Sequence, residues 1–165
     1  MTIEQDIERI KAQEEAIVFA RFDEDEAFRL GVALRERAVA ASMPLVIDVR
    51  TWDRQLFQCA LPGSTEANAD WVRRKINVVM RFARSSYRAS LEQNREDGLF
   101  APRFGLDPAE YAPAGGGFPI RLANAGIIGT VSISGLPQRE DHALVVAMLC
   151  AHLGLDGQAL ALPAT

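Results

Sequence analysis

The chain has 165 residues, of which 48% are hydrophobic and 24% are charged, and these values are ordinary for one soluble globular domain. Its net charge of −4 argues against general nucleic-acid binding, and no window approaches the about 18 consecutive apolar residues of a membrane helix. The acidic N-terminal segment lacks a signal-peptide pattern, and Cys59 and Cys150 fit neither a metal site nor a disulfide framework. We therefore expect one cytoplasmic domain over residues 1–165, without a membrane or nucleic-acid partner.

The N-terminal part of the chain predicts a helix, a strand and a second helix. Residues 1–14 form the expected N-terminal helix, because isoleucines recur there at helical spacing. Residues 16–22 are β-branched and aromatic and predict a strand. The second helix is expected from the acidic cap after residue 22 to about residue 41, with Phe28 and Val39 on its apolar face.

The middle of the chain predicts a hairpin, a long helix and a long loop. Residues 45–50 and 55–60 are strand patterns joined by four residues. Residues 66–94 show the longest helical periodicity and predict one amphipathic helix. Residues 95–117 are rich in proline and glycine and predict an irregular loop with one helical turn at 107–111.

The last part predicts a second hairpin, from residues 118–122 and 126–134, and a final helix. Pro137 suits the first helical position, and Gly154 suits the stop that follows Leu153. The order is α-β-α-β-β-α-β-β-α. This order predicts an α+β layer fold, with helices packed on a mostly antiparallel sheet.

The final helix is apolar nearly all round between residues 143 and 153. A helix on the surface of a monomer usually keeps one polar face, so this helix is expected to be buried on two sides. In a domain of this size the second covering surface is most simply another subunit. The sequence therefore predicts a homo-oligomer.

His142 is one of only two histidines, and its role stays open between two interpretations. It can be a structural or interface histidine, or it can ligate haem or transfer a proton. Asp141 is its neighbour in sequence, so the two side chains diverge on a helix and form no dyad there. His152 lies about 80° away around the same helix, so the two histidines do not chelate one metal ion.

Two further patterns can bind an anion. Gly115-Gly116-Gly117 can direct backbone N–H groups at an anion, although a plain turn before the strand explains the glycines as well. The long helix carries an arginine stripe that can hold a carboxylate, remain a solvated face, or pair with the acidic N-terminal block. Residues 1–29 hold nine acidic and four basic residues, whereas residues 71–90 hold six basic residues and no acidic one. No nucleophile motif and no catalytic set is recognisable.

An ordered set of short motifs resembles the haem-degrading-domain family. The set comprises Trp71-Val-Arg-Arg-Lys75, Arg81-Phe82, Ser85-Ser86-Tyr87, Gly115-Gly-Gly-Phe-Pro-Ile120, Gly129-Thr-Val-Ser-Ile-Ser-Gly-Leu-Pro-Gln138 and Asp141-His142. The resemblance covers residues 10 to 155. It implies a profilin-like layer fold with a five-stranded antiparallel sheet, a homo-oligomer and, in some members, haem binding with slow oxidative degradation.

Three functions follow from these observations. In the first, an oligomer binds a haem-like or other anionic ligand between the long helix, the glycine loop and the last helix, with haem as a candidate cofactor. The residues expected to line that site are Arg74, Lys75, Tyr87, Gly116, Gly117 and His142. Arg74 and Lys75 would hold anionic groups, and His142 or Tyr87 would ligate a metal. In the second, the same pocket performs oxidative chemistry, and in the third the protein is a structural or adaptor oligomer without small-molecule chemistry.

Overall fold

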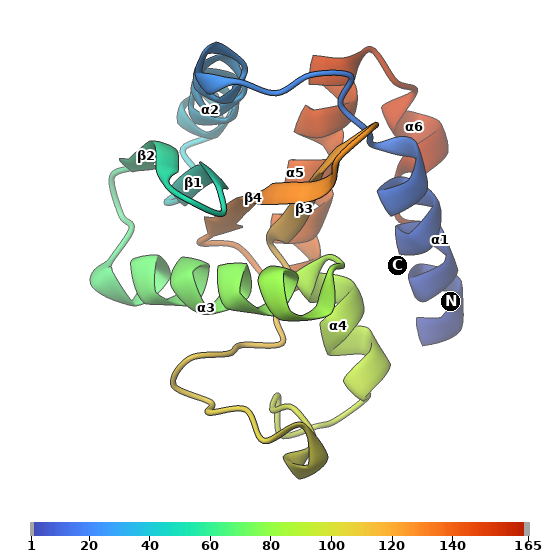
Figure 1. Ribbon diagram of the computed structural model, residues 1–165. Coiled ribbons are helices and arrows are strands. Elements are labelled where there is room, and N and C mark those ends of the chain that lie inside the picture. The colour runs from blue at the N-terminus through green and yellow to red at the C-terminus, as the bar shows by residue number, and fades with distance from the viewer. Residues whose placement is uncertain (1, 164–165) are drawn as a thin grey trace.

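A computed structural model describes residues 2–163 (Figure 1). The helices and strands, in chain order, are α1 (Ile3–Ala16), α2 (Glu24–Ala40), β1 (Val46–Thr51), β2 (Gln55–Ala60), α3 (Glu66–Phe82), α4 (Ser86–Gln93), the short 3-10 helix η1 (Pro102–Phe104), β3 (Gly117–Leu122), β4 (Gly126–Ser134), α5 (Gln138–Leu153) and α6 (Gly157–Leu160). No helix within these residues is long and apolar enough to cross a bilayer. The predicted α+β fold, with helices flanking an antiparallel sheet, is confirmed.

The sheet has four strands in the order β2-β1-β4-β3, and every neighbouring pair is antiparallel. Helices α2 and α5 cover one face and α3 covers the other, which gives three layers (Figure 1). Alternation along β1 explains this arrangement. Ile47 and Val49 belong to the core cluster that includes α2 and α5, whereas Val46 packs with Val72 and Ile76 of α3.

The prediction of a five-stranded sheet is wrong, because residues 16–22 form no strand. Helix α1 continues to Ala16, and Phe19 makes only an isolated bridge with Leu122. Its backbone N–H donates to the Arg121 carbonyl at 2.8 Å. The adjacent part of β3 contains Pro119, which has no N–H to offer a fifth strand. The profilin-like description of the fold stays a prediction.

The prediction of one helix over residues 66–94 is also wrong. Ala83 adopts a left-handed conformation with φ 53°, and the chain restarts as α4 after Ser85. The Ser85 hydroxyl caps α4 by accepting from the Arg88 N–H at 3.2 Å. The Ser85 N–H donates to a Glu14 carboxylate oxygen at 2.7 Å. This contact with α1 stabilises the break between α3 and α4. Periodicity continues across the break and concealed it.

Helix α5 is covered on several sides by its own chain. It packs against β3, β4, α2, α4 and α6, and beyond its first turn its exposed positions are the small apolar residues Ala143, Ala147 and Ala151. The apolar composition of α5 is therefore explained without a second subunit, and the homo-oligomer stays a prediction. The expected stop is confirmed, since Gly154 ends the helix in the left-handed conformation with φ 70°.

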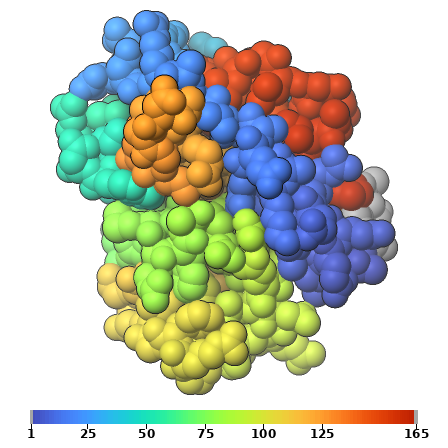
Figure 2. Space-filling view, turned by 45° about the vertical axis from the view of Figure 1, so that its right-hand side comes forward, coloured from blue at the N-terminus to red at the C-terminus, as the bar shows by residue number. Residues whose placement is uncertain are grey.

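Helices α1 and α6 lie side by side on the outside of the molecule, next to α4 and α5 (Figures 1 and 2). Gln13 donates to the Leu160 carbonyl at 2.7 Å, and Arg9 donates to the Ala159 carbonyl. The Glu14 carboxylate pairs with Arg88 at 2.7 Å. This ion pair joins the acidic N-terminal block to the basic stripe within one chain.

Candidate functional site

A buried ion pair joins α3 to the first turn of α5. The Lys75 ammonium lies 2.9 Å from a carboxylate oxygen of Asp141 and donates to the Ile133 carbonyl at 2.9 Å. Only 3% of the Lys75 side chain and 1% of the Asp141 side chain are exposed. Burial lowers the pKa of Lys75 and raises the pKa of Asp141, and in both cases the charge of the partner opposes the shift. Such a pair beside an accessible cleft is a candidate functional site.

Asp141 also shapes the turn that leads into α5. Its second carboxylate oxygen accepts from the Leu136 N–H at 3.0 Å. The N-terminal cap of α5 is Pro137, which makes no side-chain hydrogen bond to the helix. The Glu140 and Asp141 N–H groups donate to the Pro137 carbonyl, so this end of α5 offers the N–H groups of Gln138 and Arg139 and the positive end of the helix dipole.

The glycine loop packs tightly against this end of α5. A Cβ atom at Gly116, whose φ is 126°, would lie 2.8 Å from the Lys75 ammonium nitrogen, and one at Gly115 would lie 2.0 Å from the Gln138 carbonyl oxygen. The Gly117 N–H donates to the Ser86 hydroxyl at 2.9 Å. The Gly115 N–H donates to the Gln138 side chain at 3.3 Å. Two of the three amides therefore serve the fold, and the loop forms a close-fitting wall beside Lys75.

A cleft of about 300 Å³ opens beside the ion pair. We call it the Lys75 cleft, and it is lined by Asn68, Trp71, Lys75, Ala114, Ser134, Gly135, Leu136, Gln138 and Asp141. Ser134, at the end of β4, is 5% exposed and lines the cleft. Trp71 forms a wall that remains 39% exposed. The cleft lies between α3, the glycine loop and α5, where the sequence places the ligand pocket.

Arg74 supports the cleft from outside. Its guanidinium stacks 4.2 Å from the centre of the Trp71 ring, and it is held by Asp70 at 2.9 Å. It also donates to the Pro108 carbonyl at 3.3 Å. These contacts fix the indole as a wall, whereas the guanidinium itself is not part of the lining.

His142 and Tyr87 lie on the other side of α5 and do not reach the Lys75 cleft. The His142 Nε2 atom lies 2.8 Å from the side-chain oxygen of Gln13, and the His142 ring centre lies 5.1 Å from that of Tyr87. Burial and the nearby Arg139 charge lower the pKa of His142 to about 3. Its Nδ1 atom is buried without a partner among the residues that the structure describes. The predicted divergence of Asp141 and His142 is confirmed.

The described residues do not fit haem in the predicted way. His142 is buried beneath α1 with Nε2 engaged, and His152 is held by Glu26. Tyr87 is buried as well. An axial ligand needs an accessible nitrogen or oxygen atom, whereas His142 and Tyr87 are buried and the Nε2 atom of His152 is engaged by Glu26. Within residues 2–163 there is also no group of three or more histidine, cysteine or acidic side chains that could hold a metal ion.

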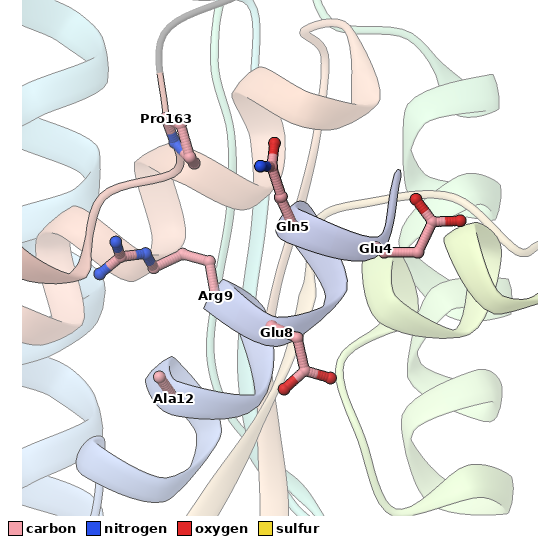
Figure 3. Close-up of a pocket in the computed structure, with 6 residues that line it drawn as sticks. All are labelled: Glu4, Gln5, Glu8, Arg9, Ala12 and Pro163. Atoms are coloured by element: carbon pink, nitrogen blue, oxygen red, sulfur yellow. The ribbon is translucent and has the colours of Figure 1, made fainter. Parts of the chain in front are cut away.

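A larger hollow of about 630 Å³ lies on the outer face of α1, beside Pro163. Its polar side chains point away from one another rather than towards a common centre (Figure 3). Convergent polar groups are what fix the orientation of a ligand, so this hollow does not have the features of a built site.

The family assignment follows from comparison with known proteins. The model of the haem degrading HbpS-like proteins matches residues 22–150. The chain belongs to the HbpS-like haem-degrading protein family. The predicted family resemblance is thereby confirmed, and the family range contains α2 to α5, the sheet and the Lys75 cleft.

Individual relatives extend this similarity to nearly the whole chain. A UPF0303 protein of Mesorhizobium japonicum is 52% identical over 162 residues, covering 98% of this chain and 97% of the relative. The crystal structure of the Ybr137w protein superposes with a TM-score of 0.84 at 26% identity and covers 92% of each chain. The complex of PduOC with haem has a TM-score of 0.66 at 14% identity, covering 82% of this chain and 97% of that chain, and shows a shared fold alone.

Sequence reasoning missed most of the Lys75 cleft, although the signal was present. It selected Lys75, and it attributed Asp141 to the helix dipole. Trp71, Lys75, Ser134, Gly135, Leu136, Gln138 and Asp141 all lie in the motif segments that carry the family resemblance. The separation of Lys75 and Asp141 by 66 residues hid their contact.

Proposed function

We propose that the protein binds a small organic anion in the Lys75 cleft. The observation that carries this proposal is that Lys75, Ser134 and the N-terminal end of α5 at Gln138 line one cleft. This end of α5 has no side-chain cap. An ammonium group, a hydroxyl and helix amides together form the kind of site that accepts carboxylate or phosphate oxygens.

The ion pair contributes a donor rather than a net charge. Lys75 carries three N–H donors, and two of them are used by Asp141 and by the Ile133 carbonyl. The third donor remains for a ligand. Because Asp141 neutralises Lys75, the attraction for an anion comes mainly from the helix end and the hydrogen bonds, and a ligand of low charge is favoured.

The walls favour a small ligand with a planar apolar part. Trp71 presents its indole, held by Arg74 at 4.2 Å, and aromatic faces stack on planar groups. Ligand clefts usually measure about 300 to 1,000 Å³, so the cleft of about 300 Å³ suits a small molecule and not a tetrapyrrole. We keep the cytoplasm as the expected location, and both cysteines are free thiols, as a reducing compartment favours.

Fluorescence titration tests this function. The chain has two tryptophans, so a Trp52→Phe variant leaves Trp71 as the single reporter at the cleft. Titrating this variant with benzoate, phenyl phosphate and inorganic phosphate is expected to give saturable changes, with the aromatic anions binding more tightly than inorganic phosphate. Ser134→Ala in the same background is expected to weaken binding about tenfold, because a hydrogen bond to a charged group is lost.

The matched control is Ser42→Ala, which removes an exposed hydroxyl in the turn after α2, outside the cleft lining. Saturable binding that is equal in the Ser134→Ala and Ser42→Ala variants would contradict the site. Absence of binding by any of the three anions would favour the adaptor oligomer instead. Hemin is titrated in parallel, and a Soret shift that disappears in His142→Ala would contradict the assignment of His142 as a structural residue.

A further inference from the structure

The two edges of the sheet are protected very differently. The β3 edge contains Pro119 and is bridged by Phe19, whose backbone pairs with residues 121 and 123. The β2 edge has the sequence Gln-Leu-Phe-Gln-Cys-Ala, without charge or proline, and β1 is its only strand partner among residues 2–163. Proteins normally block such an edge with charges, proline or a covering segment.

The register shows which groups of β2 point outward. Leu61 N–H donates to the Leu45 carbonyl at 2.8 Å, and the pairing with β1 is regular from Phe57 to Ala60. Hydrogen-bonded pairs alternate along an antiparallel ladder, so Phe57 and Cys59 also bond to β1. Gln58 and Ala60 therefore direct their backbone N–H and C=O groups to the free side.

An apolar stripe on α2, interrupted by the exposed Arg35, continues this edge. Phe28 is 59% exposed, and its ring meets that of Phe57 edge-on with centres 6.2 Å apart. Val39 is 50% exposed and lines a hollow together with Pro62, just beyond β2. Helix α2 lies close on β2, since a Cβ atom at Gly31 would lie 2.3 Å from the Phe57 ring. Strand β2 and the exposed side of α2 thus form one surface at the outer margin of the sheet, and we call it the β2–α2 margin (Figure 1).

We infer that the β2–α2 margin is the contact surface for a second copy of this chain. The two β2 strands pair antiparallel across a two-fold axis, so that two four-stranded sheets become one continuous sheet. When the two-fold axis is perpendicular to the sheet, the same face of each sheet lies on the same side of the combined sheet. A register in which Gln58 lies at the axis satisfies this condition. Gln58 then lies opposite Gln58 of the second copy, and Phe57 lies opposite Cys59.

A second copy suits this surface better than a partner of different sequence. Because β2 carries no charge, the strand can oppose itself without placing like charges together. The outward backbone groups of Gln58 and Ala60 supply the donors and acceptors that the same strand in a copy needs. The stripe on α2 adds apolar area beside the strand, as an isologous interface requires. This inference does not depend on ligand binding in the Lys75 cleft.

Light scattering coupled to size exclusion tests the surface. We expect the wild-type protein at about 50 µM to contain an even number of chains, and Gln58→Lys to halve that mass, because two like charges then face each other. Mixing Gln58→Lys with Gln58→Glu is expected to restore the mass. Met80→Lys is the matched control, since Met80 is 52% exposed on α3, and it is expected to leave the mass unchanged.

A cross-link tests the register separately. Gln58→Cys in a Cys59→Ser background is expected to form a disulfide between two copies, because a hydrogen-bonded pair has Cα atoms about 5.5 Å apart, within disulfide range. Met80→Cys in the same background is expected to remain monomeric on a non-reducing gel. A wild-type monomer at 50 µM, an unchanged mass in Gln58→Lys, or equal cross-linking at positions 58 and 80 would overturn the inference.

Discussion

Two buried polar clusters lie on opposite sides of α5, and consecutive residues contribute to them. Asp141 faces α3, pairs with Lys75 at 2.9 Å and borders an open cleft. His142 faces α1, and its Nε2 atom lies 2.8 Å from the side-chain oxygen of Gln13. His142 lines neither the Lys75 cleft nor the hollow between α1, α5 and the residues around α6. Burial alone therefore does not distinguish a candidate site from a structural contact, whereas access to a cleft does.

The two clusters also differ in what their charges do. In the Lys75–Asp141 pair, burial lowers the pKa of Lys75 and raises that of Asp141, and the charge of each partner opposes the shift of the other. His142 has no acidic partner, and Arg139 is nearby, so its imidazole stays neutral. We therefore expect changes on the α3 side to alter both stability and ligand binding, and changes on the α1 side to alter stability alone.

The largest effect is expected from Asp141→Ala. It leaves the buried Lys75 ammonium with only the Ile133 carbonyl, and it removes the acceptor of the Leu136 N–H. An uncompensated buried charge typically costs about 3 to 5 kcal/mol of unfolding free energy. Urea denaturation at pH 7 measures this loss, and bound phenyl phosphate is expected to offset part of it, because it supplies a negative charge beside Lys75.

The matched control is the double variant Lys75→Met with Asp141→Leu, which replaces the pair by apolar side chains. We expect it to regain most of the lost stability, because the remaining charge is no longer buried alone. It should bind phenyl phosphate more weakly than the wild type, because the Lys75 donor is removed. A loss of unfolding free energy below about 1 kcal/mol in Asp141→Ala would mean that water reaches the Lys75 ammonium and that the ion pair is accessible to solvent.

The second effect is the pH dependence of stability that His142 causes. His142 is protonated near pH 6.5 in the unfolded chain, whereas in the folded chain burial lowers its pKa to about 3. Lowering the pH between these values therefore favours unfolding, by about 1.4 kcal/mol per pH unit and about 2 kcal/mol in total at pH 5. His142→Phe should remove this part of the pH dependence, while phenyl phosphate binding stays unchanged.

Urea titrations of wild type and His142→Phe at pH 7 and pH 5 give this difference directly, because contributions of the carboxylates cancel. His152→Phe is the control, since the side chain of His152 is partly exposed and paired with Glu26. Equal pH dependence in wild type and His142→Phe would show that His142 is protonated in the folded protein, and the contrast between the two sides of α5 would fail.

Most of the fold could be predicted because local patterns specify it. The two hairpins and α2 were recognisable from alternation, turn residues and caps. The break at Ala83 could not be found in this way, because it depends on a hydrogen bond from Ser85 to Glu14, which is 71 residues distant. The strand expected at 16–22 failed for a similar reason, since its pairing depends on whether β3 offers an N–H at Pro119.

The candidate site was less predictable than the fold. Lys75 was selected for its charge, but Asp141 looked like an ordinary acidic residue at a helix start. His142 attracted a functional interpretation because histidine often ligates metals, although its surroundings are a glutamine and aromatic rings. Whether Asp141 or His142 reaches an open cleft depends on how α3 and α1 dock against α5, and no local pattern carries that information.

The smallest effects are expected from substitutions of two adjacent serines. Ser85 contacts α1, on one side of α5, and Ser86 contacts the loop on the side of the Lys75 cleft. Ser85 caps α4 and contacts α1 through Glu14, whereas the Ser86 hydroxyl accepts from the Gly117 N–H at 2.9 Å, beside the loop that walls the cleft. Ser85→Ala should cost about 1 kcal/mol, the usual value for a lost cap, and leave phenyl phosphate binding unchanged. Ser86→Ala should also cost about 1 kcal/mol, and it should weaken binding because the loop loses its anchor. Equal binding losses in both variants, measured by Trp71 fluorescence, would show that the cleft responds to the cap of α4, and the two sides of α5 would then have to be treated as one coupled site.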